Sequence, residues 1–173
     1  MEINNCKSFK NKKLPKILND NLLAYIDCSF TDLEGLPEII KGDLSIGSPE
    51  LTSLWGSPKV VQGDFDVTWN DKLTTLKYAP KDMRAINAQK CPIIDVSDLF
   101  ESEVYQCCYV DFLENLAALP LVKFNIFFFS INLYDPFAVI MHRYKNNSSK
   151  ENIINCQIDL FKNGFEKNAR WIP

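Results

Sequence analysis

A unit of 21 or 22 residues occurs twice in the middle of this chain. Residues 42–46 (GDLSI) return as residues 63–67 (GDFDV), and residues 51–54 (LTSL) return as residues 73–76 (LTTL). A proline, Pro58 or Pro80, follows each of the two later segments. One such unit cannot bury its own apolar side chains, whereas stacked units bury a continuous core. The repeat therefore predicts a solenoid.

Each unit opens with alternating apolar and polar residues, which is typical of a half-buried strand. A turn rich in Gly, Ser, Pro, Asn and Asp follows, and a Leu-x-x-Leu pair then returns to the core. Weaker copies precede residue 41 and follow residue 82, so we expect four strand units. Their apolar strand positions are Ile26 and Cys28, Leu44 and Ile46, Phe65 and Val67, and Ile86 and Ala88.

Residues 65–70 (FDVTWN) fit the L-x-L-x-x-N core of a leucine-rich repeat, with Asn70 placed to satisfy backbone groups in the turn. The turn at 47–49 (GSP) departs from this pattern. With the stretches IDCSFTDLEGLPEIIKGDLS and LTSLWGSPKVVQGDFDV, residues 22–81 resemble the short leucine-rich-repeat-like proteins of large tailed bacteriophages. The resemblance implies no catalytic residues. It implies an accessory protein that inhibits or redirects a host enzyme or defence factor in the host cytoplasm.

After Leu99 the repeat fades and helical patterns replace it. Apolar residues share one side of 111–119, Asp135-Pro136 predicts a helix start, and SSKE at 148–151 predicts a capping box for a helix that Gly164 ends. We expect an α+β fold: a short, irregular leucine-rich-repeat-like solenoid with a helical C-terminal cap. Its predicted parts are an N-terminal cap (1–20), the array (21–100) and the C-terminal cap (101–173).

The charge balance disfavours one class of partner. A formal net charge of -3 and an isoelectric point near 5.2 argue against a nucleic-acid binder that relies on general attraction to phosphate. A nucleic-acid binder that uses a local basic patch near the N-terminus remains an alternative. The lysines of that patch are Lys7, Lys10, Lys12, Lys13 and Lys16.

No segment predicts secretion or membrane insertion. The N-terminal stretch MEINNCKSFKNKK lacks the apolar run of a signal peptide, and the most apolar stretch, 119–133, contains Pro120, Lys123 and Asn125. The six cysteines form no C-x-x-C pair. We expect a cytoplasmic protein without membrane contact, whose cysteines are buried thiols.

Nothing in the sequence indicates catalysis. There is no Walker loop, no G-x-G-x-x-G, no H-E-x-x-H and no zinc-type spacing. His142 is the only possible imidazole base, and an enzyme would need it paired with a carboxylate between the array and the cap. We therefore expect no enzyme, no cofactor and no metal, with that small enzyme as an alternative.

The polar strand positions form the candidate site. By the alternation they point away from the core, and stacking would join them into one surface, the strand face. Four of its nine positions are Asp, which predicts either a binding surface for a basic host protein or a charged face that only keeps the sheet soluble. Trp69 or Trp55 would add an aromatic anchor, and Trp171 is either a plug on the cap or a second anchor. The strand-face positions are Tyr25, Asp27, Asp43, Ser45, Asp64, Asp66, Thr68, Asn87 and Gln89.

Overall fold

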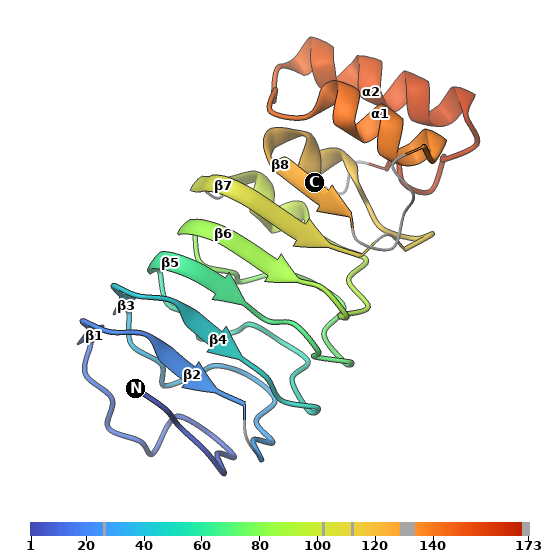
Figure 1. The fold of residues 1–173 in the computed structure, drawn as a ribbon. Helices are drawn as coiled ribbons and strands as arrows, with labels where there is room; N and C mark the ends of the chain where they lie inside the picture. Colours follow the sequence, from blue (N-terminus) through green and yellow to red (C-terminus); the bar gives the residue numbers. More distant parts are fainter. Residues whose placement is uncertain (26, 102, 112, 129–133, 171–173) are drawn as a thin grey trace.

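The chain forms a parallel β solenoid that ends in two helices. The computed structural model describes residues 1–173 except 26, 102, 112, 129–133 and 171–173. All strand pairs are parallel, and the strands stack into one sheet along the length of the molecule (Figure 1). The strands are β1 (Ile17–Leu18), β2 (Leu22–Ala24), β3 (Ile39–Ile40), β4 (Leu44–Ile46), β5 (Val60–Asp66), β6 (Asp82–Ala88), β7 (Glu103–Val110) and β8 (Asn125–Phe128).

The register of the sheet confirms the repeat in the middle of the chain. Leu44 pairs with Phe65 and Phe65 pairs with Ile86, as the alternation predicts, and all three side chains are buried. The column extends in both directions to Leu22 and Cys108. Each turn thus places one apolar side chain on the same buried line, so the solenoid has a continuous core.

The predicted first unit is wrong by four residues. Leu22 and Ala24, and not residues 26 and 28, pair with Leu44 and Ile46. Residue 26 lies outside the described residues, and Cys28 is buried in the turn after β2. Residues 25–28 alternate between polar and apolar as a strand does. The segment that pairs with β4, however, is residues 22–24, which lie 22 positions before β4 in the sequence. Tyr25 and Asp27 therefore follow the strand instead of belonging to it.

The Leu-x-x-Leu pairs form the second wall of the core. Leu54 and Leu76 are fully buried, and each accepts a backbone hydrogen bond from the residue three positions later. Leu33 makes the same contact one turn earlier, so the Leu-x-x-Leu pair of the first unit is Phe30-x-x-Leu33. Pro37, Pro58 and Pro80 follow as expected, and all three are buried. This wall has the period that the repeat predicts.

A ladder of buried polar groups joins the turns after the strands. Asn70 Nδ2 donates to the carbonyl oxygen of Ile46, in the preceding turn of the solenoid, at 3.0 Å, and Asn70 Oδ1 accepts from the backbone nitrogen of Ser48 at 2.8 Å. Cys91 Sγ donates to the equivalent carbonyl oxygen of Val67 at 2.9 Å. These bonds satisfy buried backbone groups that the sheet leaves unpaired. The predicted role of Asn70 is confirmed.

The sheet continues beyond the point where the repeat fades in the sequence. β7 pairs with β6 from Asp82 to Ala88, and β8 pairs with β7. The helix expected over 111–119 is wrong: the described residues there form turns that lead into a short 3₁₀ helix, Leu119–Lys123. A second 3₁₀ helix, Ser97–Glu101, precedes β7. The backbone nitrogens of Ala117 and Ala118 donate to the carbonyl oxygens of Ile94 and Asn168, so tertiary contacts outweigh the local helical pattern in this region.

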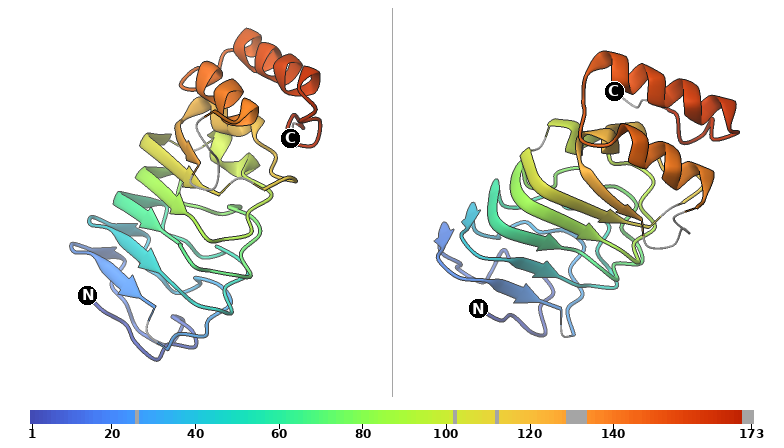
Figure 2. Two further views of the ribbon diagram at one scale, coloured as in Figure 1. Left: turned by 45° about the vertical axis from the view of Figure 1, so that its right-hand side comes forward. Right: turned by 45° about the horizontal axis from the view of Figure 1, so that its top comes forward.

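Two helices, α1 (Pro136–Tyr144) and α2 (Lys150–Lys162), cover the far end of the solenoid (Figure 2). Asp135 is the N-cap of α1, as predicted, and its Oδ1 accepts from the backbone nitrogen of Phe137 at 2.8 Å. The N-cap of α2 is Ser149, one residue later than the predicted capping box places it. Phe137, Met141, Cys156 and Leu160 are buried between these helices and the core.

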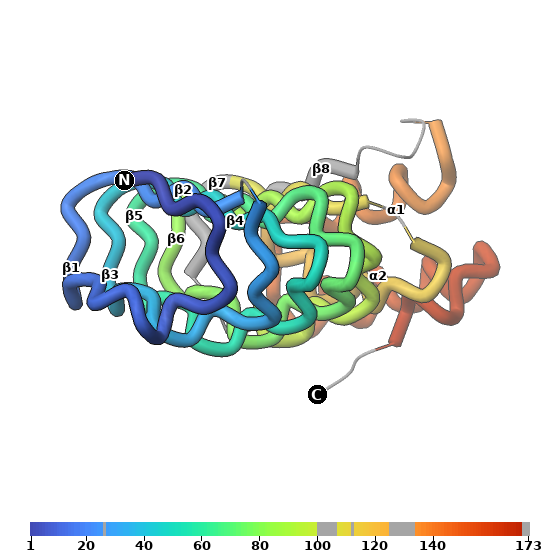
Figure 3. The backbone as a smooth tube through the Cα atoms, turned by 90° about the horizontal axis from the view of Figure 1, so that it is seen from below, coloured from blue at the N-terminus to red at the C-terminus, as the bar shows by residue number. Residues whose placement is uncertain are grey.

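The N-terminal segment closes the opposite end (Figure 3). Ile3 donates a backbone hydrogen bond to the carbonyl oxygen of Leu23 at 2.8 Å, and the rings of Phe9 and Phe30 lie 4.7 Å apart. Both open ends of the apolar core are thereby covered by chain of a different pattern. No helix in the described part of the chain is long and apolar enough to cross a membrane.

Candidate functional site

One of the four predicted acidic side chains, that of Asp43, holds neighbouring turns of the solenoid together. Asn21 Oδ1 accepts from the backbone nitrogen of Asp43 at 2.8 Å, and Asp43 Oδ1 accepts from the backbone nitrogen of Asp64 at 2.9 Å. Gly42 and Gly63 precede these aspartates, and a Cβ on either glycine would overlap the acceptor oxygen of the previous turn. The repeated Gly-Asp pair is therefore a structural device: glycine leaves room for the oxygen that caps the next backbone N–H.

Arg84 pairs with the Asp64 carboxylate and lies close to that of Asp43. Its Nε and NH2 atoms lie 2.7 and 2.6 Å from the two oxygens of Asp64, and NH2 lies 3.7 Å from Asp43 Oδ1. This two-pronged contact, with the nearby charge of Asp43, raises the pKa of the Arg84 guanidinium above its ordinary value. The repulsion between Asp43 and Asp64 is thus reduced within the chain, which leaves less unbalanced acid on the strand face than the sequence predicts.

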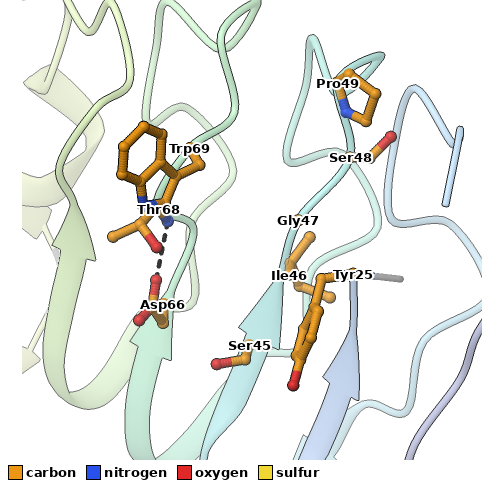
Figure 4. A pocket seen from close by; sticks show the side chains of 9 residues that line it. All are labelled: Tyr25, Ser45, Ile46, Gly47, Ser48, Pro49, Asp66, Thr68 and Trp69. Carbon is orange, nitrogen blue, oxygen red and sulfur yellow. Dashed lines mark hydrogen bonds between the residues drawn. The ribbon is translucent and has the colours of Figure 1, made fainter. Parts of the chain in front are cut away.

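The remaining predicted residues separate into one group and two outliers. Tyr25, Asp66 and Trp69 line a single hollow of about 420 Å³ at the carboxyl end of β4 and β5 (Figure 4). Asp27 lies in the exposed turn after β2 and does not line the hollow. Trp171 lies outside the described residues. The other residues that line the hollow are Ser45, Ile46, Gly47, Ser48, Pro49 and Thr68.

A shortened turn creates the hollow. Two residues, Thr68 and Trp69, separate Val67 from Asn70, whereas only Gly47 separates the equivalent residues Ile46 and Ser48. The backbone nitrogen of Gly47 donates to the carbonyl oxygen of Ala24 at 2.9 Å, and a Cβ at Gly47 would lie 2.9 Å from Tyr25 Cβ. The middle turn is therefore recessed, and the longer turns on either side rise above it.

Aromatic side chains form the walls of the hollow and polar groups form its floor. Trp69 is 69% exposed and Tyr25 is 49% exposed, and they rise from the turns on opposite sides of Gly47 (Figure 4). Trp69 has a φ of 62°, a conformation that costs free energy for a bulky side chain. Asp66 Oδ1 accepts from the backbone nitrogen of Thr68 at 2.8 Å, which fixes the carboxylate beside the hydroxyl groups of Ser45 and Thr68. No lysine or arginine lines this hollow.

Trp55 does not join this group. It lies in the turn that leads into β5, where its ring contacts Tyr78 at 5.2 Å in an edge-to-face arrangement. Trp55 is 55% exposed. It therefore serves as a natural comparison for Trp69, because both are exposed tryptophans in turns of the solenoid.

The residues on which the two alternative functions depend have other contacts. Partial burial and the charge of Lys145 lower the pKa of His142, which favours the neutral imidazole. Lys10 pairs with Glu34 at 2.7 Å, and Lys16 lies 3.8 Å from Glu38. Lys7, Lys12 and Lys13 are exposed. Two of the five N-terminal lysines are thus already paired with carboxylates of the next turn.

The cysteines behave as the sequence predicts, with one exception. Cys6, Cys28, Cys91, Cys108 and Cys156 are buried, Cys107 is partly exposed, and all six are free thiols. Burial raises the pKa of Cys91 to about 11, which keeps its Sγ protonated as the donor of the ladder. Within the residues that the structure describes, no group of three His, Cys, Asp or Glu side chains is placed to hold a metal ion.

Sequence analysis missed the residues that shape the hollow and those that stabilise its surroundings. Arg84 carries no repeat signature, so its role could not be inferred. Gly47 gave a usable signal, because the turn at 47–49 is shorter than the turn that ends at Asn70. Cys91 gave another, because cysteine replaces asparagine at this position in some leucine-rich repeats. Comparison of the chain with protein-family models, with curated proteins and with solved structures finds no significant match.

Proposed function

We propose that this protein is a non-enzymatic interaction module that binds a partner protein with a basic surface through its strand face. One observation carries the proposal: Tyr25 and Trp69 stand exposed around a hollow whose floor holds the carboxylate of Asp66. Exposed aromatic side chains supply much of the binding energy of protein interfaces, and here they surround a negative charge. A basic partner fits this combination better than an acidic or a wholly apolar one.

The resemblance of residues 22–81 to phage repeat proteins adds a biological setting to the proposal. In that setting the partner is a host enzyme or defence factor, and the bound chain inhibits or redirects it in the host cytoplasm. The rigid solenoid supports this role, because side chains on stacked turns lose little conformational freedom when a partner docks.

The test is affinity capture from bacterial lysate with the full chain and two variants. We expect Tyr25→Ala combined with Trp69→Ala to lose the captured partner, because both anchors are removed while the core is untouched. Trp55→Ala is the matched control and should retain the partner. Association should slow as salt concentration rises, since the partner is basic. Undiminished capture by the double variant would show that the strand face is not the binding surface.

A further inference from the structure

The hollow between Tyr25 and Trp69 has the chemistry of a site for one cationic side chain. Its floor contains the Asp66 carboxylate and two hydroxyl groups, and no lysine or arginine lines it. An apolar side chain placed there would leave these polar groups without water or partner, at a cost in free energy. A carboxylate would be repelled by Asp66. A cation can pair with the carboxylate, and such charge-assisted hydrogen bonds are stronger than those of a neutral polar side chain.

Aromatic rings beside the carboxylate also suit a cation. Tyr25 and Trp69 line the hollow from turns that are separated by the turn of Gly47 (Figure 4). Cations interact favourably with aromatic rings within about 6 Å of the ring centroid. A charged group in the hollow can thus meet an aromatic wall as well as the Asp66 carboxylate.

We propose that this hollow binds the guanidinium group of an arginine side chain that projects from the partner protein. The planar guanidinium stacks on aromatic faces and sheds its water more readily than the ammonium of lysine. Asp66 lines the hollow, and because its Oδ1 accepts from the Thr68 backbone N–H, the carboxylate is held in place as an acceptor for the guanidinium. The volume of about 420 Å³ accommodates the side chain with part of its backbone.

The recess at Gly47 keeps the hollow open. A side chain at that position would meet Tyr25 Cβ at 2.9 Å and would fill the space between the walls. Trp69 presents its ring to the hollow from a left-handed backbone, at a cost in backbone strain. This inference rests on the proposed function only in taking the arginine to come from a protein partner.

A titration of the full chain with Nα-acetyl-arginine methylamide tests the site. The side-chain indole N–H signal of Trp69 in a ¹H–¹⁵N spectrum reports binding, and that of Trp55 is the internal control. We expect a saturable shift of the Trp69 signal with a dissociation constant on the order of millimolar, as for other single small groups. The citrulline analogue, which has the same shape without charge, should bind at least about tenfold more weakly.

Two variants and one control sharpen the result. Asp66→Asn retains an acceptor for the Thr68 N–H but loses the charge, so binding should weaken about fivefold or more. Ser45→Leu fills the floor and should abolish the shift. Asp71→Asn removes an exposed carboxylate that does not line the hollow and should bind like the wild type. Equal binding of citrulline or of the lysine analogue, or no effect of Asp66→Asn, would overturn the proposal.

The two proposals fail in different ways. If capture of a partner depends on Tyr25 and Trp69 but the hollow does not respond to the arginine probe, the interaction module stands and the guanidinium site is refuted. If the hollow responds specifically to the probe but no captured partner depends on these residues, the guanidinium site stands and the proposed function is refuted.

Discussion

Asp43 Oδ1 accepts a hydrogen bond from the backbone nitrogen of Asp64, one turn further along the solenoid, at 2.9 Å. Asn21 makes the same contact with Asp43 at 2.8 Å, so an amide oxygen serves as well as a carboxylate. We expect Asp43→Ala to lower the free energy of unfolding by about 1 kcal/mol, because the site is half-exposed. Asp43→Asn should cost less. Urea unfolding checks both, and equal losses would assign the effect to the charge beside Arg84.

Gly63→Ala should destabilise the chain by about 1–3 kcal/mol through steric overlap. The new Cβ would lie 2.8 Å from the backbone nitrogen of Asp43 and from the carbonyl carbon of Gly42. Gly164→Ala is the comparison, since its Cβ meets no atom within 4 Å and only its φ of 82° opposes the change. Thermal unfolding of both variants checks the order, and a smaller loss at Gly63 would contradict the tight stacking of the Gly-Asp pairs.

Leu54→Ala and Leu76→Ala should each cost about 2–5 kcal/mol, because each removes a fully buried side chain and leaves a cavity. The two losses should be similar, since the residues occupy the same position in successive turns. Ile94→Ala, at a side chain that is 45% exposed, is the control and should cost much less. Chemical denaturation gives the values. Losses below about 1 kcal/mol at both leucines would contradict their equivalence.

Asn70→Ala should cost about 3 kcal/mol, since it leaves several buried backbone groups without partners. Asn70→Asp should also destabilise, because a carboxylate cannot donate to the carbonyl oxygens of Ile46 and Val67. Asn155→Ala, on the exposed side of α2, is the control. Unfolding in urea separates the three. A near-neutral Asn70→Ala would mean that water replaces the amide in the ladder.

A chain that ends at Leu99 should aggregate or unfold without cooperativity. It would lack β7, which pairs with β6 from Asp82 to Ala88, and would expose the buried side chains of Met83 and Ile86. Size-exclusion chromatography and thermal unfolding against the full chain are the measurements. A stable monomer of residues 1–99 would instead show that the C-terminal part is an independent unit.

The sequence by itself determined the type of architecture and much of its core. The spacing of 21 or 22 residues, the alternation at Leu44, Phe65 and Ile86, and the Leu-x-x-Leu pairs all describe local chemistry that repeats. Such a pattern can be recognised in the sequence without knowledge of distant contacts, because each unit buries the same side chains against its neighbours. The start of α1 at Asp135 is local for the same reason, since an N-cap acts within three residues.

Only the tertiary structure decided which segments stack and what the strand face offers. Residues 22–24 and 25–28 are both credible strands locally, and pairing with β4 selected the first. β7 and β8 lack the repeat signature but continue the sheet, because an open edge of β6 binds the next chain segment that fits. Arg84 reached two aspartates from an earlier part of the chain, and a turn shortened at Gly47 became a hollow between Tyr25 and Trp69. These features depend on distances between turns, which residue order alone does not contain.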